Sequence, residues 1–143
     1  MTNESALVDK IVAELDALIN PTVDDVKENN YRVEAFPESP KEYELNHPNG
    51  VVLVRAGSYR PSLLNGNKQS DFTDVILTLL ANGLKGEIGL YALSQITKQS
   101  METVWHNGAR FYCTGATPPI IYQDDIWERD MNFTLPGVHI IGL

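Results

Sequence analysis

The central stretch of the sequence, residues 72–81, reads FTDVILTLLA. As an extended segment it carries apolar side chains on both faces, with Val75, Leu77, Leu79 and Ala81 on one and Phe72, Ile76 and Leu80 on the other. Strands that are apolar on both faces are typical of positions inside a sheet that is covered on each side. We therefore expect residues 72–81 to form a central strand around which the other elements pack.

Four other segments have the composition of strands. Residues 51–54, VVLV, are β-branched and apolar, as in short buried strands. Residues 31–36 alternate charged and apolar side chains, and residues 110–114 form a further short candidate. Residues 126–135 alternate throughout, with Trp127, Arg129, Met131, Phe133 and Leu135 on one side and Glu128, Asp130, Asn132 and Thr134 on the other. We expect this last strand to have one dry face and one wet, acidic face.

Two segments have the period of amphipathic helices. The first ends before Asn20-Pro21 and repeats apolar residues at three- and four-residue steps. The second runs from about Glu87 to Trp105. The predicted fold is a single α+β domain over residues 1–143, with a mixed or antiparallel sheet, two helices packed on it and the element order α-β-β-β-α-β-β.

Two apolar stretches are hard to place on a lone molecule. Residues 57–69 are rich in Gly, Pro and Asn and are predicted to form a long loop, yet they carry apolar side chains. Residues 136–143 form an apolar C-terminal arm. Neighbouring copies of the chain would cover both stretches, so the candidate interface residues are Tyr59, Leu63, Leu64, Val138, Ile140, Ile141 and Leu143. The alternative is that the terminus adds an edge strand to its own sheet.

Composition narrows the classes of function. The 143 residues (15.9 kDa) include 11 Lys+Arg and 19 Asp+Glu, which gives a net charge of −8 and a pI near 4.7. This balance argues against a protein that grips duplex DNA or anionic lipid through clustered positive charge. No stretch approaches the roughly 18 apolar residues of a membrane span, and no signal peptide is recognisable. With one cysteine, Cys113, we expect an intracellular chain in a reducing compartment.

Candidates for catalysis are weak, and we predict neither an enzyme nor a cofactor. His47, His106 and His139 have no partner at a metal-ligand spacing, and Cys113 lacks a nucleophile signature. The pairs Asp24-Asp25 and Asp124-Asp125 could supply carboxylates to a divalent cation. Runs of charge are more often solvated turns or caps, which makes a metal-dependent phosphodiesterase the minor alternative.

A resemblance adds to this interpretation. The order of helices and strands, the stretch GLYAL at residues 89–93 and the stretch DIWERDMNF at residues 125–133 resemble the small tail-terminator proteins of long-tailed bacteriophages, relatives of minor tail protein U. The similarity covers roughly residues 4–136. The run GATPP at residues 115–119 departs from it and leaves the role of that connection open.

Such a resemblance implies a virion protein of the tail or neck, assembled in the host cytoplasm. Members of the tail-terminator family form a hexameric ring that caps the tail tube, ends tube polymerisation and joins the tube to neck or head-completion proteins. The implied partners are further copies of the chain, the tail-tube protein and the neck protein, with a tail sheath as a further candidate, and without a membrane. The alternatives are a tail-tube or baseplate ring subunit and a small monomeric binding module.

DNA would meet such a ring only in transit through its channel. Six copies at −8 each carry −48 formal charges, and an acidic channel would let a genome slide rather than stick. The candidates for channel-lining or solvent-facing acidic residues are Glu34, Asp124, Asp125, Glu128 and Asp130.

Overall fold

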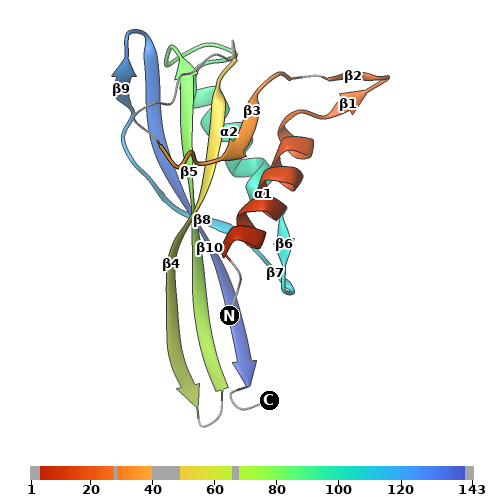
Figure 1. Cartoon of the computed structure of the whole chain (residues 1–143), viewed down its shortest axis with the longest axis vertical. Coiled ribbons are helices and arrows are strands. Elements are labelled where there is room, and N and C mark those ends of the chain that lie inside the picture. Colours follow the sequence, from red (N-terminus) through yellow and green to blue (C-terminus); the bar gives the residue numbers. More distant parts are fainter. Residues whose placement is uncertain (1–3, 28, 40–48, 66–67, 141–143) are drawn as a thin grey trace.

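The computed structural model describes residues 4–27, 29–39, 49–65 and 68–140. Figure 1 shows a long, twisted sheet with two helices beside its upper half. In chain order the elements are α1 (Glu4–Ile19), β1 (Thr22–Val23), β2 (Val26–Lys27), β3 (Arg32–Ala35), β4 (Val51–Asn65), β5 (Lys68–Asn82), α2 (Leu90–Met101), β6 (Trp105–His106), β7 (Ala109–Arg110), β8 (Tyr112–Ala116), β9 (Ile120–Gln123) and β10 (Ile126–Ile140). The α+β class with two helices is confirmed, and the strands outnumber those that the sequence predicted.

Strand β5 occupies the centre of the main sheet, as its two apolar faces predicted. The strand order is β3-β4-β5-β10-β8, with β9 also paired to β10. Strand β3 runs parallel to β4, and the other pairs are antiparallel. The β5–β10 ladder is unbroken from Asn82↔Ile126 to Lys68↔Ile140. Strands β1 and β2, and β6 and β7, form separate two-stranded hairpins.

One face of the sheet packs against both helices. Every fourth residue of α1 points into this core, and each is at most 2% exposed: Leu7, Ile11, Leu15 and Ile19. Alternate residues of β5 and Phe133 of β10 meet them from the sheet. The end of α1 is tied to the start of β3 because the Asn20 amide donates to the Tyr31 carbonyl and accepts from the Tyr31 N–H, both at 2.8 Å.

The opposite face of the sheet has no helix over it, and we call it the helix-free face. A small cluster of Val51, Leu53 and Leu80 is buried there, with Phe36, Tyr122 and Ile126 packed against it. Both faces of β5 are covered, as predicted, but in the part of the chain that the structure describes helices cover only one of them. The second apolar face of β5 is covered by side chains of neighbouring strands instead.

The predicted loop over residues 57–69 is wrong, because the described part of this stretch belongs to two long strands. Strand β4 continues to Asn65 and pairs with β5 from Lys68 onward. The register shifts between Ala56 and Tyr59, which marks a β-bulge at Gly57-Ser58. A Cβ on Gly57 would lie 3.0 Å from the Asp74 side chain, so this close approach favours glycine. Pro61 is tolerated because β4 is an outer strand here.

The ends of several other elements differ from the predicted ones. Helix α2 begins at Leu90 and ends at Met101, and Trp105 belongs to the β6–β7 hairpin. Strand β9 lies within the predicted connection over residues 115–125. Strand β10 continues to Ile140, and the backbone of residues 138–140 pairs with β5. This agrees with the alternative prediction, in which the terminus adds a strand to its own sheet.

Gly50 gives a test of this packing. Its φ of +121° is unfavourable for any other residue, and a Cβ there would lie 2.7 Å from the Leu80 carbonyl oxygen in the centre of the sheet. We expect Gly50→Ala to lower the free energy of unfolding by about 2 kcal/mol or more, measured by urea denaturation. The matched control is Gly115→Ala, where a Cβ would meet nothing within 4 Å. Equal midpoints for the two variants would contradict this account of the sheet.

Candidate functional site

The lower half of the sheet extends beyond the helices as a three-stranded arm, which Figure 1 shows running away from the helical layer. The arm comprises residues 59–65 of β4, 68–73 of β5 and 135–140 of β10. Each of these strands has 15 residues and spans about 50 Å in full. Three strands alone are at the lower limit of independent stability in water, and the arm is held by being continuous with the main sheet.

The outer edges of the arm carry no further strand among the described residues. Strand β3 pairs with β4 only at residues 51–54, and strands β8 and β9 pair with β10 only at residues 126–134. Open edges of this kind can template pairing with another chain. Each outer strand contains a proline, Pro61 in β4 and Pro136 in β10, and each proline removes one backbone donor.

Tyr59 is the candidate interface residue whose side chain the structure describes. It lies on the arm, is 39% exposed and donates a hydrogen bond from its hydroxyl to the Asp71 carboxylate at 2.9 Å. That bond raises the pKa of Tyr59, with burial and the negative charge of Asp71 acting in the same direction. The contact fixes a large amphipathic ring at the surface of the arm, in the manner of residues that anchor protein interfaces.

The other predicted interface segments meet at the tip of the arm. Leu63 of β4 and His139 of β10 both pair with Gln69, one on each side of β5. The structure therefore places two stretches that lie far apart in the sequence on either side of β5 at the same end of the sheet. Ile141 and Leu143 lie outside the described residues, as do the side chains of Leu63, Leu64, Val138 and Ile140.

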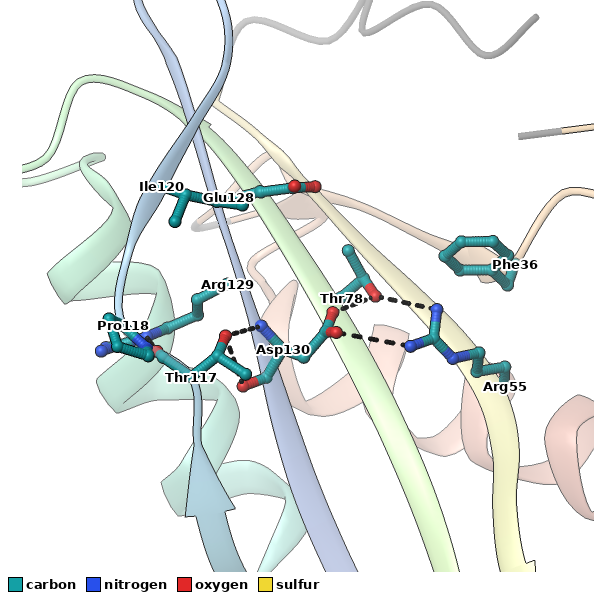
Figure 2. Close-up of a pocket in the computed structure, with 9 residues that line it drawn as sticks. All are labelled: Phe36, Arg55, Thr78, Thr117, Pro118, Ile120, Glu128, Arg129 and Asp130. Atoms are coloured by element: carbon teal, nitrogen blue, oxygen red, sulfur yellow. Dashed lines mark hydrogen bonds and ion pairs between the residues drawn. The ribbon is translucent and has the colours of Figure 1, made fainter. Parts of the chain in front are cut away.

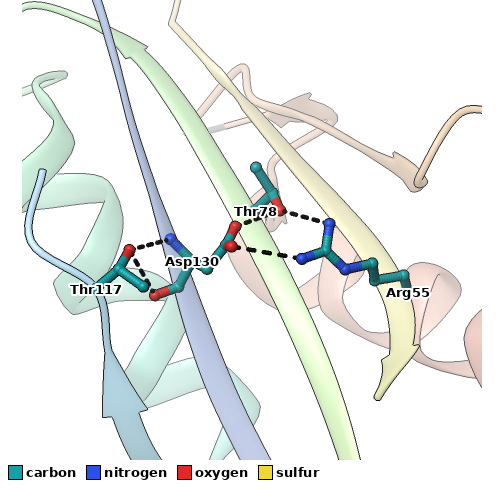
Figure 3. Close-up of polar contacts among 4 residues, drawn as sticks. All are labelled: Arg55, Thr78, Thr117 and Asp130. Atoms are coloured by element: carbon teal, nitrogen blue, oxygen red, sulfur yellow. Dashed lines mark hydrogen bonds and ion pairs between the residues drawn. The ribbon is translucent and has the colours of Figure 1, made fainter. Parts of the chain in front are cut away.

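The helix-free face carries a polar network centred on Asp130 (Figure 3). The Asp130 carboxylate accepts hydrogen bonds from the Thr78 hydroxyl at 2.6 Å and from the Arg55 guanidinium at 3.4 Å. Its backbone N–H donates to the Thr117 hydroxyl at 2.9 Å, and its carbonyl accepts from the Thr117 N–H at 2.9 Å. Asp130 thus links β4, β5 and β10 to the connection that follows β8.

Beside this network lies an open hollow of about 320 Å³ (Figure 2). Phe36, Pro118 and Ile120 supply its apolar walls, and the Arg55 guanidinium stacks on the Phe36 ring at 4.6 Å from the centroid. Glu128 also lines the hollow. Burial raises the pKa of Glu128, the nearby Asp130 charge raises it further, and Arg55 opposes both. Arg55 and Asp130 form an ion pair at 3.4 Å within this lining.

The predicted acidic residues fall into two groups. Glu34, Glu128 and Asp130 share the helix-free face, whereas Asp124 and Asp125 are exposed in the turn between β9 and β10. Arginines offset the first group: Arg32 lies 3.3 Å from Glu34, Arg55 lies 3.4 Å from Asp130, and Arg60 lies 2.8 Å from Asp74 on the same face. The face is therefore mixed in charge.

The sequence-based interpretation missed the arginines of β4. Because residues 57–69 were predicted to be a loop and residues 51–54 a strand that ended early, neither Arg55 nor Arg60 was assigned to a face. The signal was present: continuing the alternation of residues 51–54 by one residue places Arg55 on the same face of the strand as Leu53.

The residues considered for metal chemistry are dispersed. Asp24-Asp25 and Asp124-Asp125 lie in the turns of two different hairpins, on opposite sides of the molecule in Figure 1. Within residues 4–27, 29–39, 49–65 and 68–140, no three His, Cys, Asp or Glu side chains are close enough to hold a metal ion together. His47 and the side chain of His139 lie outside the described residues. No described helix is both long and apolar enough to cross a bilayer.

The sequence of the chain matches a known protein family over a region that includes part of the arm. The family model described as Gp37 protein matches residues 26–102, which is more than half of the chain. The match begins at β2, includes β4 and β5 of the arm, and ends just after α2. A search of curated proteins finds no match.

The raised pKa of Glu128 predicts a specific pH dependence. Because folding favours its protonated form, the free energy of unfolding falls as the pH rises from the ordinary glutamate pKa through the raised value. Glu128→Gln removes this loss. We expect the melting temperature of the variant to exceed that of the natural protein at pH 7, and the difference to vanish below about pH 4. Glu87→Gln, at an exposed position, is the control, and a pH-independent difference for Glu128→Gln would refute the prediction.

Proposed function

The chain belongs to the Gp37 family of phage-related proteins, and on that premise we propose that it is the subunit of a hexameric ring that closes the end of a phage tail tube. In this role it is a structural protein of the virion and performs no catalysis. The ring ends polymerisation of the tube and presents a surface to the neck or head-completion proteins. A tail sheath is a further candidate neighbour.

The arm is the observation that carries this proposal. The start of α1 reaches only its base, where Leu135 joins the core and Tyr59 lies beside Leu7, and the two outer edges of the arm have no strand partner among the described residues. Tyr59 and Phe72 lie on opposite faces of the arm. Tyr59 is exposed and Phe72 is partly buried. An element of this size is stable when neighbouring subunits cover it, and a closed ring supplies the same cover to every copy.

Prolines determine how neighbouring arms can meet. Pro61 and Pro136 interrupt the donors of the two outer strands, so a long backbone ladder between subunits cannot form across these positions. Neighbours therefore meet the arm through side chains. The side chains available for this are Tyr59 on one face and, on the other, Arg60, which lies 5.5 Å from the centroid of the Phe72 ring of the same chain.

Passage of DNA sets the second requirement on such a ring. The chain carries −8, and the Asp124-Asp125 turn contributes two exposed carboxylates for which the described residues provide no ion pair. The helix-free face contributes less repulsion because its arginines offset its carboxylates. We therefore favour the turn over the helix-free face as the acidic surface turned toward DNA.

Purified protein tests the assembly directly. We expect a native mass of six chains and ring-shaped particles by negative-stain microscopy. Added to growing tail tubes, the rings should bind one end only and stop elongation. Rings that stack into tubes would instead identify a tube subunit, and a monomer at micromolar concentration would refute the ring.

Tyr59 tests the role of the arm within the ring. We expect Tyr59→Ser to raise the concentration at which half of the chains are assembled by about tenfold or more, because truncating a buried interface aromatic costs about 2 kcal/mol. Tyr91→Ser is the matched control, since Tyr91 is a comparably exposed tyrosine (46% against 39%) on α2. Equal assembly of the two variants would remove the arm from the interface.

A further inference from the structure

Two small hairpins on the helical side of the molecule have opposite chemistry. Figure 1 shows β1–β2 and β6–β7 well separated, one beyond each end of the helical layer. Both turns have two residues with positive φ, 52° and 63° at Asp24-Asp25 and 50° and 80° at Asn107-Gly108. Turns of this kind match the natural twist of paired strands, so each hairpin presents its side chains in a defined way.

The β6–β7 hairpin is an aromatic and cationic patch on an acidic protein. Trp105 is 58% exposed, and the Arg110 guanidinium lies over its ring at 5.2 Å from the centroid. No described carboxylate lies within ion-pair distance of Arg110. Tryptophan and arginine are the residue types that most often dominate the energy of protein interfaces. The patch therefore has an apolar surface and a charge that a partner can satisfy.

Helix α1 holds this hairpin in place. The Lys10 ammonium donates to the Trp105 carbonyl at 2.7 Å and lies 3.0 Å from Nδ1 of His106. Burial lowers the pKa of His106, the Lys10 charge lowers it further and Glu14 opposes them, a direction that favours the neutral ring whose Nδ1 can accept from Lys10. Because the hairpin is fastened through its backbone, its exposed Trp105 and Arg110 side chains are left to face outward.

The β1–β2 hairpin has the complementary composition. Val23 and Val26 are 49% and 66% exposed, and they flank Asp24 and Asp25, which are exposed at the turn. Neither carboxylate has an ion pair among the described residues. The hairpin thus offers two apolar side chains and two negative charges within four consecutive residues.

We propose that the β1–β2 hairpin of one copy docks on the β6–β7 hairpin of the next copy in the ring. The Asp24 and Asp25 carboxylates meet Arg110, and Val23 and Val26 cover the Trp105 ring. Copies that each carry −8 repel one another, so a stable contact requires a place where opposite charges meet, and this patch provides one.

The position of the hairpins suits a head-to-tail contact. They cannot reach each other within one chain, because the helical layer lies between them in Figure 1. A contact between two different patches of the same protein is heterologous, which is the kind that generates rings. The inference therefore rests on the proposed ring and names one of its interfaces.

A double-mutant cycle tests the contact in the full-length protein. Asp24→Asn with Asp25→Asn removes two charges and keeps residues that accept positive φ, and Arg110→Gln removes the opposing charge. Each variant should raise the half-assembly concentration by about tenfold, as expected for loss of a close interfacial charge pair. The half-assembly concentration of the combined variant should not exceed the higher of the two values for the separate variants, because both remove the same contact.

The matched control removes the same two charges from a different exposed turn, with Asp124→Asn and Asp125→Asn. Lower net charge alone should leave assembly unchanged or strengthen it, so weakening by the Asp24 and Asp25 changes has the opposite sign from a general charge effect. Half-assembly concentrations would be measured by sedimentation velocity.

The outcomes separate this contact from the ring itself. Additive effects in the cycle, or rings that form as in the natural protein with every variant, would overturn the contact and leave the ring in place. A natural protein that stays monomeric at all concentrations would overturn the ring and the contact together.

Discussion

The double pairing of β5 is the constraint on which the rest of the structure depends. This strand is hydrogen-bonded to β4 on one side and to β10 on the other along nearly its whole length. Because side chains alternate strictly, this register decides which residues of all three strands face the helices and which form the helix-free face. It also carries the sheet past the helices, since two long ladders continue where the helical core has ended. Core, polar face and arm therefore all follow from one strand.

Sequence patterns predicted the parts of the fold that bury apolar surface. The two apolar faces of residues 72–81 indicated a central strand, the four-residue steps of α1 indicated its buried stripe, and the alternation of residues 126–135 separated Phe133 from Asp130 correctly. In each case burial repeats with the period of the element, so composition is sufficient. The ends of helices and strands depend on local contacts and were less accurate.

Gly57 and Pro61 explain the main failure. Residues that normally mark a loop occur here in a strand, because a bulge and an outer edge accept them. The missed strand concealed Arg55 and Arg60, and with them the mixed charge of the helix-free face. The alternation of residues 51–54 could have placed Arg55, whereas the position of Arg60 beyond the bulge depends on pairing with β5, which local composition does not contain.

The prolines of the two outer strands have a consequence for the unassembled protein. A long, bare sheet edge invites identical edges to stack without limit, which leads to fibrils. Pro61 and Pro136 stand in both outer strands of the arm and prevent continuous stacking there. The same two residues that make the arm a poor template for its own kind leave its side chains exposed for other contacts.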